Sequence, residues 1–194
     1  LVLNFTGLDN NNFVFSIPTD TAQSVDSLTG IATFSNLVLF EGLFLTDTFV
    51  KDTTQRQRFI LTNDKVDTTS MIVEVTSGTI TEKYLQATDI TKIDSTSKVF
   101  FLEESEYQIP EILFGDGVIG KALTNGDVVT VRYTTSSGNG ANGLKVFENI
   151  GTYRDNTGNA ISSGITITAV SFPDGGAEPE TTESIKFGAP KFYS

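Results

Sequence analysis

Four acidic side chains lie close together in the sequence and are the first candidates for chemistry. Glu103, Glu104 and Glu106 are nearly adjacent, and Asp116 follows after an apolar run. A pair of carboxylates can hydrolyse glycosides when it is held across a cleft. Neighbouring residues of a strand point to opposite faces, however, and acidic runs are typical of strand edges and loops. We interpret the run as a solvated edge and rank a cell-wall glycosidase using Glu104 and Asp116 third among the functions.

The segment from Asp155 to Asn159 is rich in oxygen ligands and resembles the start of a calcium loop. Such a loop needs further ligands and a late bidentate glutamate. The chain has Ala160-Ile161-Ser162 there instead. We expect a polar turn and no metal site.

The segment from Phe114 to Gly120 holds three glycines, but without the spacing of a dinucleotide-binding loop. It leads into a strand and not into a helix, so a phosphate-binding role is not supported. Gly115, Gly117 and Gly120 instead permit a sharp change of direction between a buried strand and a hairpin. Asp116 is expected to hold this turn by accepting bonds from nearby backbone amides.

The composition removes most catalytic chemistry. The chain has no His and no Cys, so it lacks the usual proton shuttle, the thiolate nucleophile and the commonest zinc ligands. Its net charge of −11 disfavours nucleic acid as a partner. No apolar run is long enough to cross a bilayer as a helix. We expect no enzyme activity, no cofactor, no small-molecule substrate and no membrane insertion.

Apolar alternation with a period of two predicts a mainly β protein, built as short-stranded sandwich or barrel-like subdomains with little helix. The predicted strands share this alternation or a short apolar run, and they span residues 1–5, 13–17, 37–40, 43–50, 58–62, 71–76, 99–102, 112–114, 127–134 and 165–172. A tight turn is expected at Thr124–Asp127, where Asn125-Gly126 favours positive φ. Helical character is expected only from about Thr181 to Phe187.

The predicted organisation has an inserted unit. Residues 1–40 with 144–175 form one β subdomain, and 41–143 form a second that carries the Phe-Gly-Asp-Gly hairpin. Residues 176–194 start a helical segment. The chain begins at Leu1 without an initiator Met, so we expect an internal or C-terminal-region fragment of a longer protein.

Two ordered blocks of this sequence resemble the baseplate-J-like family, and more narrowly the baseplate wedge proteins of T-even-like contractile-tailed bacteriophages. The first block, residues 111–143, has an apolar strand, spaced glycines, an alternating strand and a Gly- and Asn-rich loop. Its matching residues are Phe114, Gly115, Asp116, Gly117, Gly120, Gly126, Tyr133, Gly138, Asn139 and Asn142. The second block, residues 175–190, matches at Gly175, Gly176, Glu183 and Pro190.

The resemblance implies a structural protein of the virion tail baseplate that is present in the host cytoplasm during assembly. It implies a homodimer that joins other baseplate wedge proteins in a ring, and a ring that rearranges when the tail contracts. The main alternative is a β-sandwich module of a tail or surface adhesin that binds carbohydrate or a receptor. Such a site usually offers exposed aromatic residues, often Trp, and this chain has no Trp.

Overall fold

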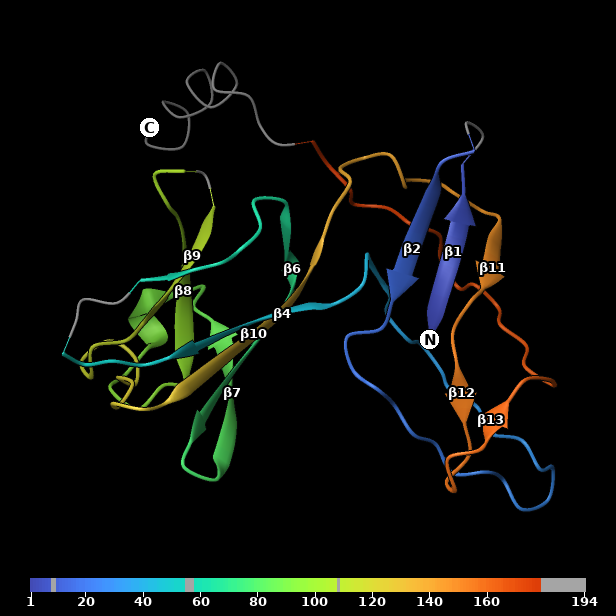
Figure 1. Ribbon diagram of the computed structural model, residues 1–194, viewed down its shortest axis with the longest axis horizontal. Coiled ribbons are helices and arrows are strands. Elements are labelled where there is room, and N and C mark those ends of the chain that lie inside the picture. Colours follow the sequence, from blue (N-terminus) through green and yellow to red (C-terminus); the bar gives the residue numbers. More distant parts are fainter. Residues whose placement is uncertain (8–9, 55–57, 108, 179–194) are drawn as a thin grey trace. The chain divides into compact units, whose positions relative to one another are not determined.

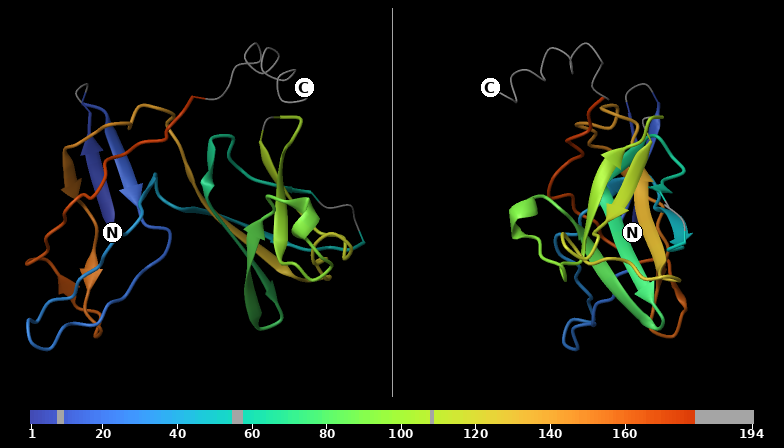
Figure 2. Two further views of the ribbon diagram at one scale, coloured as in Figure 1. Left: turned by 180° about the vertical axis from the view of Figure 1, so that it is seen from behind. Right: turned by 90° about the vertical axis from the view of Figure 1, so that its left-hand side faces the viewer.

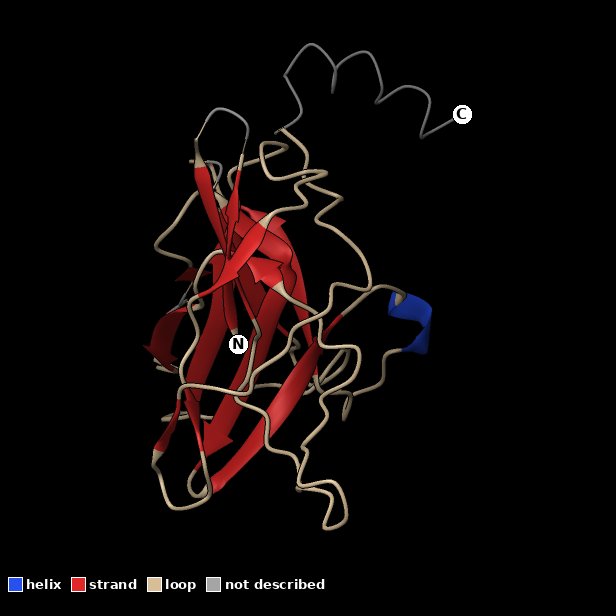
Figure 3. Ribbon diagram, turned by 90° about the vertical axis from the view of Figure 1, so that its right-hand side faces the viewer, coloured by secondary structure: helices blue, strands red, loops and turns tan. Residues whose placement is uncertain are grey.

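A computed structural model describes residues 1–7, 10–54, 58–107 and 109–178. The chain separates into two compact units, Leu1–Val14 with the chain from Ser137 onward, and Phe15–Ser136. Both are built of strands, and the 3-10 helix η1 (Ile90–Lys92) is a single short turn (Figure 3). The predicted mainly β fold is confirmed. No helix among these residues has the length and apolar character to span a membrane.

The unit Phe15–Ser136 is a strongly curved sheet that almost closes into a barrel (Figure 1). Its seven strands follow the order β4 (Leu45–Val50), β10 (Val128–Thr135), β6 (Val66–Ser77), β7 (Ile80–Gln86), β8 (Val99–Glu104), β9 (Pro110–Phe114) and β5 (Phe59–Ile60). All neighbours run antiparallel except β7 and β8, which are parallel and joined through η1.

Strand β10 lies next to the edge strand β4 in this order and pairs with β4 on one side and β6 on the other. Its sequence alternates, so Val129, Val131 and Tyr133 all point inward and are fully buried. The other core side chains come from the remaining barrel strands and the loops beside them: Phe59, Leu61, Val73, Val75, Tyr84, Phe100, Ile112 and Leu123. One contiguous core therefore fills the barrel.

Aromatic rings connect strands that lie far apart in the sheet order. Phe59 packs edge-on against Phe49 of β4, with 5.6 Å between ring centres, and against Phe114 of β9 at 5.4 Å. Phe114 in turn meets Tyr84 of β7 at 5.6 Å. Edge-to-face pairs of this kind add about 0.5–1.5 kcal/mol beyond their area burial. They draw the two edge strands, β4 and β5, towards one another.

The unit that contains both chain ends is smaller. Strand β11 (Phe147–Asn149) pairs antiparallel with β1 (Val2–Thr6), which is followed in the sheet by β2 (Asn12–Ser16). A separate hairpin is formed by β12 (Tyr153–Arg154) and β13 (Ala160–Ile161). Strand β2 crosses the boundary between the units, and its last two residues pair with β3 (Phe40–Glu41) within the barrel unit.

The unit boundaries fall elsewhere than at residues 40 and 143, where the sequence placed them. Residues 15–40 group with the barrel because the end of β2 pairs with β3 and because Arg132 donates a 2.6 Å hydrogen bond to the Pro18 carbonyl. These are pairings between distant residues, which alternation alone does not reveal.

Several local predictions are wrong. Of residues 37–40, which were predicted as a strand, only Phe40 lies in one. Residues 165–172 form no strand, although their alternation is clear. The Phe-Gly-Asp-Gly segment does not open a hairpin, because β9 lies between β8 and β5, whereas β10 lies between β4 and β6. The segment instead begins a long crossover from one part of the barrel to another. The predicted helix at 181–187 lies outside the described residues.

Strand β7 is present although the sequence did not predict it. It forms a hairpin with β6 through the two-residue turn Gly78-Thr79, in which Gly78 adopts a φ of 61°. Two-residue hairpin turns require positive φ, and glycine adopts it without strain.

Candidate functional site

The loop that follows β9 has the turn geometry expected from its glycines. Asp116 accepts hydrogen bonds from the amides of Val118 at 2.9 Å and Ile119 at 3.0 Å. These bonds, with that from Ile119 the stronger influence, lower the pKa of the Asp116 carboxyl. The amide of Gly117 donates to the Gly120 carbonyl at 3.0 Å, and both glycines have positive φ. Asp116 therefore holds the turn, as predicted.

Gly115 marks the tightest point of this loop. A Cβ atom built there would overlap the backbone carbonyl of Gly120, so no larger residue fits without moving the backbone. The Gly120 amide donates to Asp94 at 2.9 Å, and the Lys121 amide donates to Ser97 at 2.8 Å. The loop is thereby fixed to the segment that precedes β8. Its glycines permit close backbone contact, and the amides of Gly117, Val118, Ile119, Gly120 and Lys121 donate to carbonyl and carboxylate groups of the protein.

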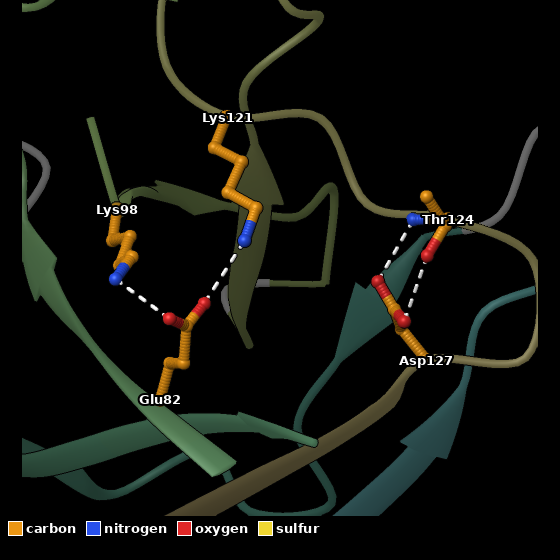
Figure 4. Close-up of polar contacts among 5 residues, drawn as sticks. All are labelled: Glu82, Lys98, Lys121, Thr124 and Asp127. Carbon is orange, nitrogen blue, oxygen red and sulfur yellow. Dashed lines mark hydrogen bonds and ion pairs between the residues drawn. The ribbon is translucent and has the colours of Figure 1, made fainter. Parts of the chain in front are cut away.

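Three charged side chains form a cluster beside the loop (Figure 4). Glu82 of β7 accepts from Lys98 at 2.7 Å and from Lys121 at 2.9 Å. The hydrogen bond from Lys98, followed by that from Lys121, lowers the pKa of Glu82, and the bond to Glu82 raises the pKa of Lys121. One carboxylate thus joins β7 to the start of β8 and to the crossover loop.

The turn before β10 is held by a buried carboxylate (Figure 4). Asp127 accepts from the backbone amide of Thr124 and from its hydroxyl, both at 2.8 Å. Burial alone would raise the pKa of Asp127, but hydrogen bonds from Thr124 and Ser77 outweigh it and lower the pKa. Gly126 has a φ of 87° and donates to the Lys51 carbonyl at 2.8 Å. The predicted positive-φ turn is confirmed.

Tyr133 lies at the opposite end of β10 and is fully buried. Its hydroxyl donates to Asp47 at 2.9 Å and accepts from the Asn63 side-chain amide at 2.7 Å. The Thr62 hydroxyl lies 3.1 Å away. Burial is the main cause that raises the pKa of Tyr133. The phenol thus connects β4, β10 and the segment after β5 within the core.

The two blocks that carry the family resemblance meet in the smaller unit. The side chain of Asn142 bonds both backbone groups of Gly176, and the amide of Asn139 donates to the Glu178 carboxylate at 3.2 Å. Gly138 has a φ of 78° and Gly175 a φ of 80°. Glu183 and Pro190 lie outside the described residues.

The acidic residues proposed for glycoside hydrolysis do not face each other. Glu104 is paired with Pro110 at one end of the β8–β9 ladder, and Asp116 follows Phe114, which is paired with Phe100 at the other end. The two rungs are four residue steps apart, about 13 Å at the rise of a strand. Glycosidase carboxyl groups lie about 5–9.5 Å apart. The geometry does not support this pair.

The segment resembling a calcium loop is the turn between β12 and β13. The Asp155 carboxylate accepts from the hydroxyl of Thr157 at 2.7 Å and from the amide of Asn159 at 2.9 Å. These bonds lower the pKa of Asp155 to about 2. Across the described part of the chain, no three acidic side chains converge as metal ligands would.

A surface that the sequence analysis missed is the segment 19–39, which we name the apolar arm. The arm begins directly after Pro18, whose carbonyl accepts a hydrogen bond from Arg132, and it contains no strand (Figure 2). Two backbone hydrogen bonds close one turn of the arm, from the Asp26 amide to the Ile31 carbonyl and from the Gly30 amide to the Asp26 carbonyl. Most of its large apolar side chains are nevertheless exposed, whereas Leu37 and Leu39 are half-buried. The exposed ones are Val25, Leu28, Ile31, Phe34 and Val38.

A signal for the arm is present in the sequence. An apolar residue recurs at every third position from 22 to 40, as Ala22, Val25, Leu28, Ile31, Phe34, Leu37 and Phe40. A period of three matches neither a strand nor an α-helix. The arm does not form a polyproline II ribbon of three residues per turn, because residues 27–29 form a turn and Gly30 and Asn36 have positive φ. Searching for periods of two and 3.6 alone overlooks this pattern.

No protein-family model matches the chain, and no curated protein sequence matches it. The resemblance to the baseplate-J-like family therefore stays a prediction from the motif residues.

Replacing Gly115 by Ala is expected to destabilise the barrel more than replacing Gly126 by Ala. The Gly126 position has open space, so the cost there is the left-handed backbone alone, about 1–2 kcal/mol. The Gly115 substitution forces the Gly120 carbonyl to move and should cost at least the upper end of the roughly 1–3 kcal/mol typical of overpacking. Urea unfolding of both variants measures this difference, and equal losses would contradict the close approach.

The carboxylates of this region predict a dependence of stability on acid pH. Glu82, Asp116 and Asp127 have folded pKa values below their ordinary values. Their contribution is fully present above the ordinary carboxyl pKa of about 4 and is lost as the pH falls through the lower folded values. The urea midpoint should therefore fall between about pH 5 and pH 2.

The dependence of the urea midpoint on pH should be weaker in Glu82→Gln, because the neutral glutamine has no negative charge to pair with the two lysine ammonium groups. Glu104→Gln removes an exposed carboxylate of equal charge and serves as the control. An identical pH profile for wild type and Glu82→Gln would show that the lysine cluster does not contribute.

Proposed function

We propose that this chain is a non-catalytic structural component of a phage tail baseplate wedge. In this role it associates with itself and with other wedge proteins, contributes to ring assembly in the virion, and changes its contacts when the tail contracts. The proposal joins the motif resemblance of residues 111–143 and 175–190 to the surfaces of the fold.

The observation that carries the proposal is the exposure of the apolar arm. Leu28 is 95% exposed, Val25 62% and Ile31 60%. Exposed apolar side chains are individually ordinary on protein surfaces. A regular series of them on a segment with little backbone bonding is typical of an interaction segment, because a partner surface must cover them. An assembly subunit needs such a surface.

The motif residues support a structural role in a second way. Gly115, Gly120 and Gly126 serve turns and close backbone contacts, and Asp116 serves as a turn cap. The side chain of Tyr133 holds the core together through its hydroxyl. These are tasks in shaping a building block.

The negative charge of the chain opposes association between copies and so affects when association takes place. The chain carries a net charge of −11, and its first 50 residues contain no Lys or Arg. Like charge between copies opposes contact and is screened by salt. The acidic surface therefore limits early self-association until a partner with basic groups docks.

The experiment is size-exclusion chromatography with light scattering on the chain alone and mixed with the other wedge proteins. The triple variant Leu28→Ser, Ile31→Ser, Phe34→Ser should lose most of the association shown by wild type. The double variant Ile80→Ser, Leu85→Ser is the control, because both side chains are 63% exposed on the barrel strand β7. Both variants should keep the wild-type unfolding midpoint.

If the triple variant associated as strongly as wild type, the arm would not be part of the interface. A wild-type chain that stays monomeric with every wedge protein, together with specific hits on a glycan array, would replace the proposal by the carbohydrate-binding alternative.

A further inference from the structure

In the smaller unit, the backbone around residues 173–178 lies along the loop 138–143. The Gly143 amide donates to the Pro173 carbonyl at 2.8 Å. Further along, the Asn139 amide donates to the Glu178 carboxylate at 3.2 Å. The two segments run in opposite directions, so the contact continues over the length of both. Neither segment is a β-strand.

Asn142 supplies the middle of this contact. Its side-chain nitrogen donates to the Gly176 carbonyl at 2.8 Å, and its side-chain oxygen accepts from the Gly176 amide at 3.0 Å. One amide side chain thus satisfies both backbone groups of one glycine, as the opposing residue of an antiparallel pair would. Asn142 replaces a strand partner at this point.

Two glycines lie at this close approach. A Cβ atom at Gly176 would overlap the carbonyl oxygen of Gly138. One at Gly138 would overlap the carboxylate of Glu178. The backbone contact requires glycine at position 176, whereas at position 138 the φ of 78° favours glycine and the flexible Glu178 side chain could move aside.

Little apolar surface is covered by this contact. Within the loop, Ala141 is buried, whereas Asn139 and Asn142 are exposed, as are most residues of 173–178. Phe172, just before the segment, is 44% exposed and lies beneath the Lys145 ammonium, 5.9 Å from its ring centre. Contacts made of exposed hydrogen bonds with little apolar burial open at low free energy.

We propose that residues 173–178 form a detachable strap, closed on the loop 138–143 by Asn142 and Glu178, that can open while the β unit stays folded. Opening breaks the four hydrogen bonds described above between the two segments. Its use in rearranging a baseplate ring rests on the proposed function, whereas the strap itself does not.

The test is amide hydrogen exchange of the chain, followed residue by residue by NMR, in wild type and in Asn142→Ala and Glu178→Gln. Asn142→Ala should speed exchange of the Gly176 and Gly143 amides at least fivefold, since it removes two of the four bonds. Glu178→Gln should speed the Asn139 amide. The thermal midpoint should not change in either variant.

One internal control and two control variants sharpen this test. The backbone amide of residue 142 donates to the Asn139 carbonyl within the loop, so the exchange rate of this amide should stay as in wild type. Asn156→Ala and Glu148→Gln remove an exposed amide and an exposed carboxylate elsewhere in the same unit.

Unchanged exchange at Gly176 and Gly143 in Asn142→Ala would show that Asn142 does not close the strap. Faster exchange throughout the unit, with a lower thermal midpoint, would show that 173–178 is an integral part of the unit and not detachable. Both outcomes concern the isolated chain, so they are independent of whether the chain assembles with wedge proteins.

Discussion

Strand β10 is the element on which the larger unit depends. It is held on both edges, by β4 and β6, and it places Val129, Val131 and Tyr133 in the barrel interior without exposure to solvent. Its start is set by the Asp127 turn and its end by the Tyr133 hydroxyl network. Because strand side chains alternate strictly, a shift of one residue would turn the whole apolar set outward. The turn and the phenol therefore fix the register on which the core depends.

Features that depend on a few neighbouring residues could be predicted from the sequence, whereas features that depend on distant residues could not. The alternation of β10, the positive-φ turn at Gly126 and the capping by Asp116 are local, and all three were predicted correctly. Residues 165–172 show the limit of the same reasoning. Their alternation satisfies a strand pattern, but they have no neighbouring strand, and a strand is stable only when its backbone groups are paired.

Features that depend on contacts between distant residues were not predicted from the sequence. In strand β7, Glu82 lies on the same face as the buried Tyr84. Its carboxylate is stabilised there by ion pairs with Lys98 and Lys121, which come later in the chain. The separation of β9 from β10 in the sheet likewise depends on pairing between distant segments. The apolar arm differs from these cases, because its period of three is visible in the sequence but belongs to no regular element of a folded core.

Under the proposed function, the apolar arm is the assembly surface of a structural subunit. The most direct measurement is amide exchange of residues 19–39, compared between conditions in which light scattering reports a monomer and conditions in which it reports the assembly with wedge proteins. The account predicts rapid exchange in the monomer and strong slowing across 22–38 on assembly. Assembly that leaves exchange in the arm unchanged, with new protection elsewhere, would contradict it.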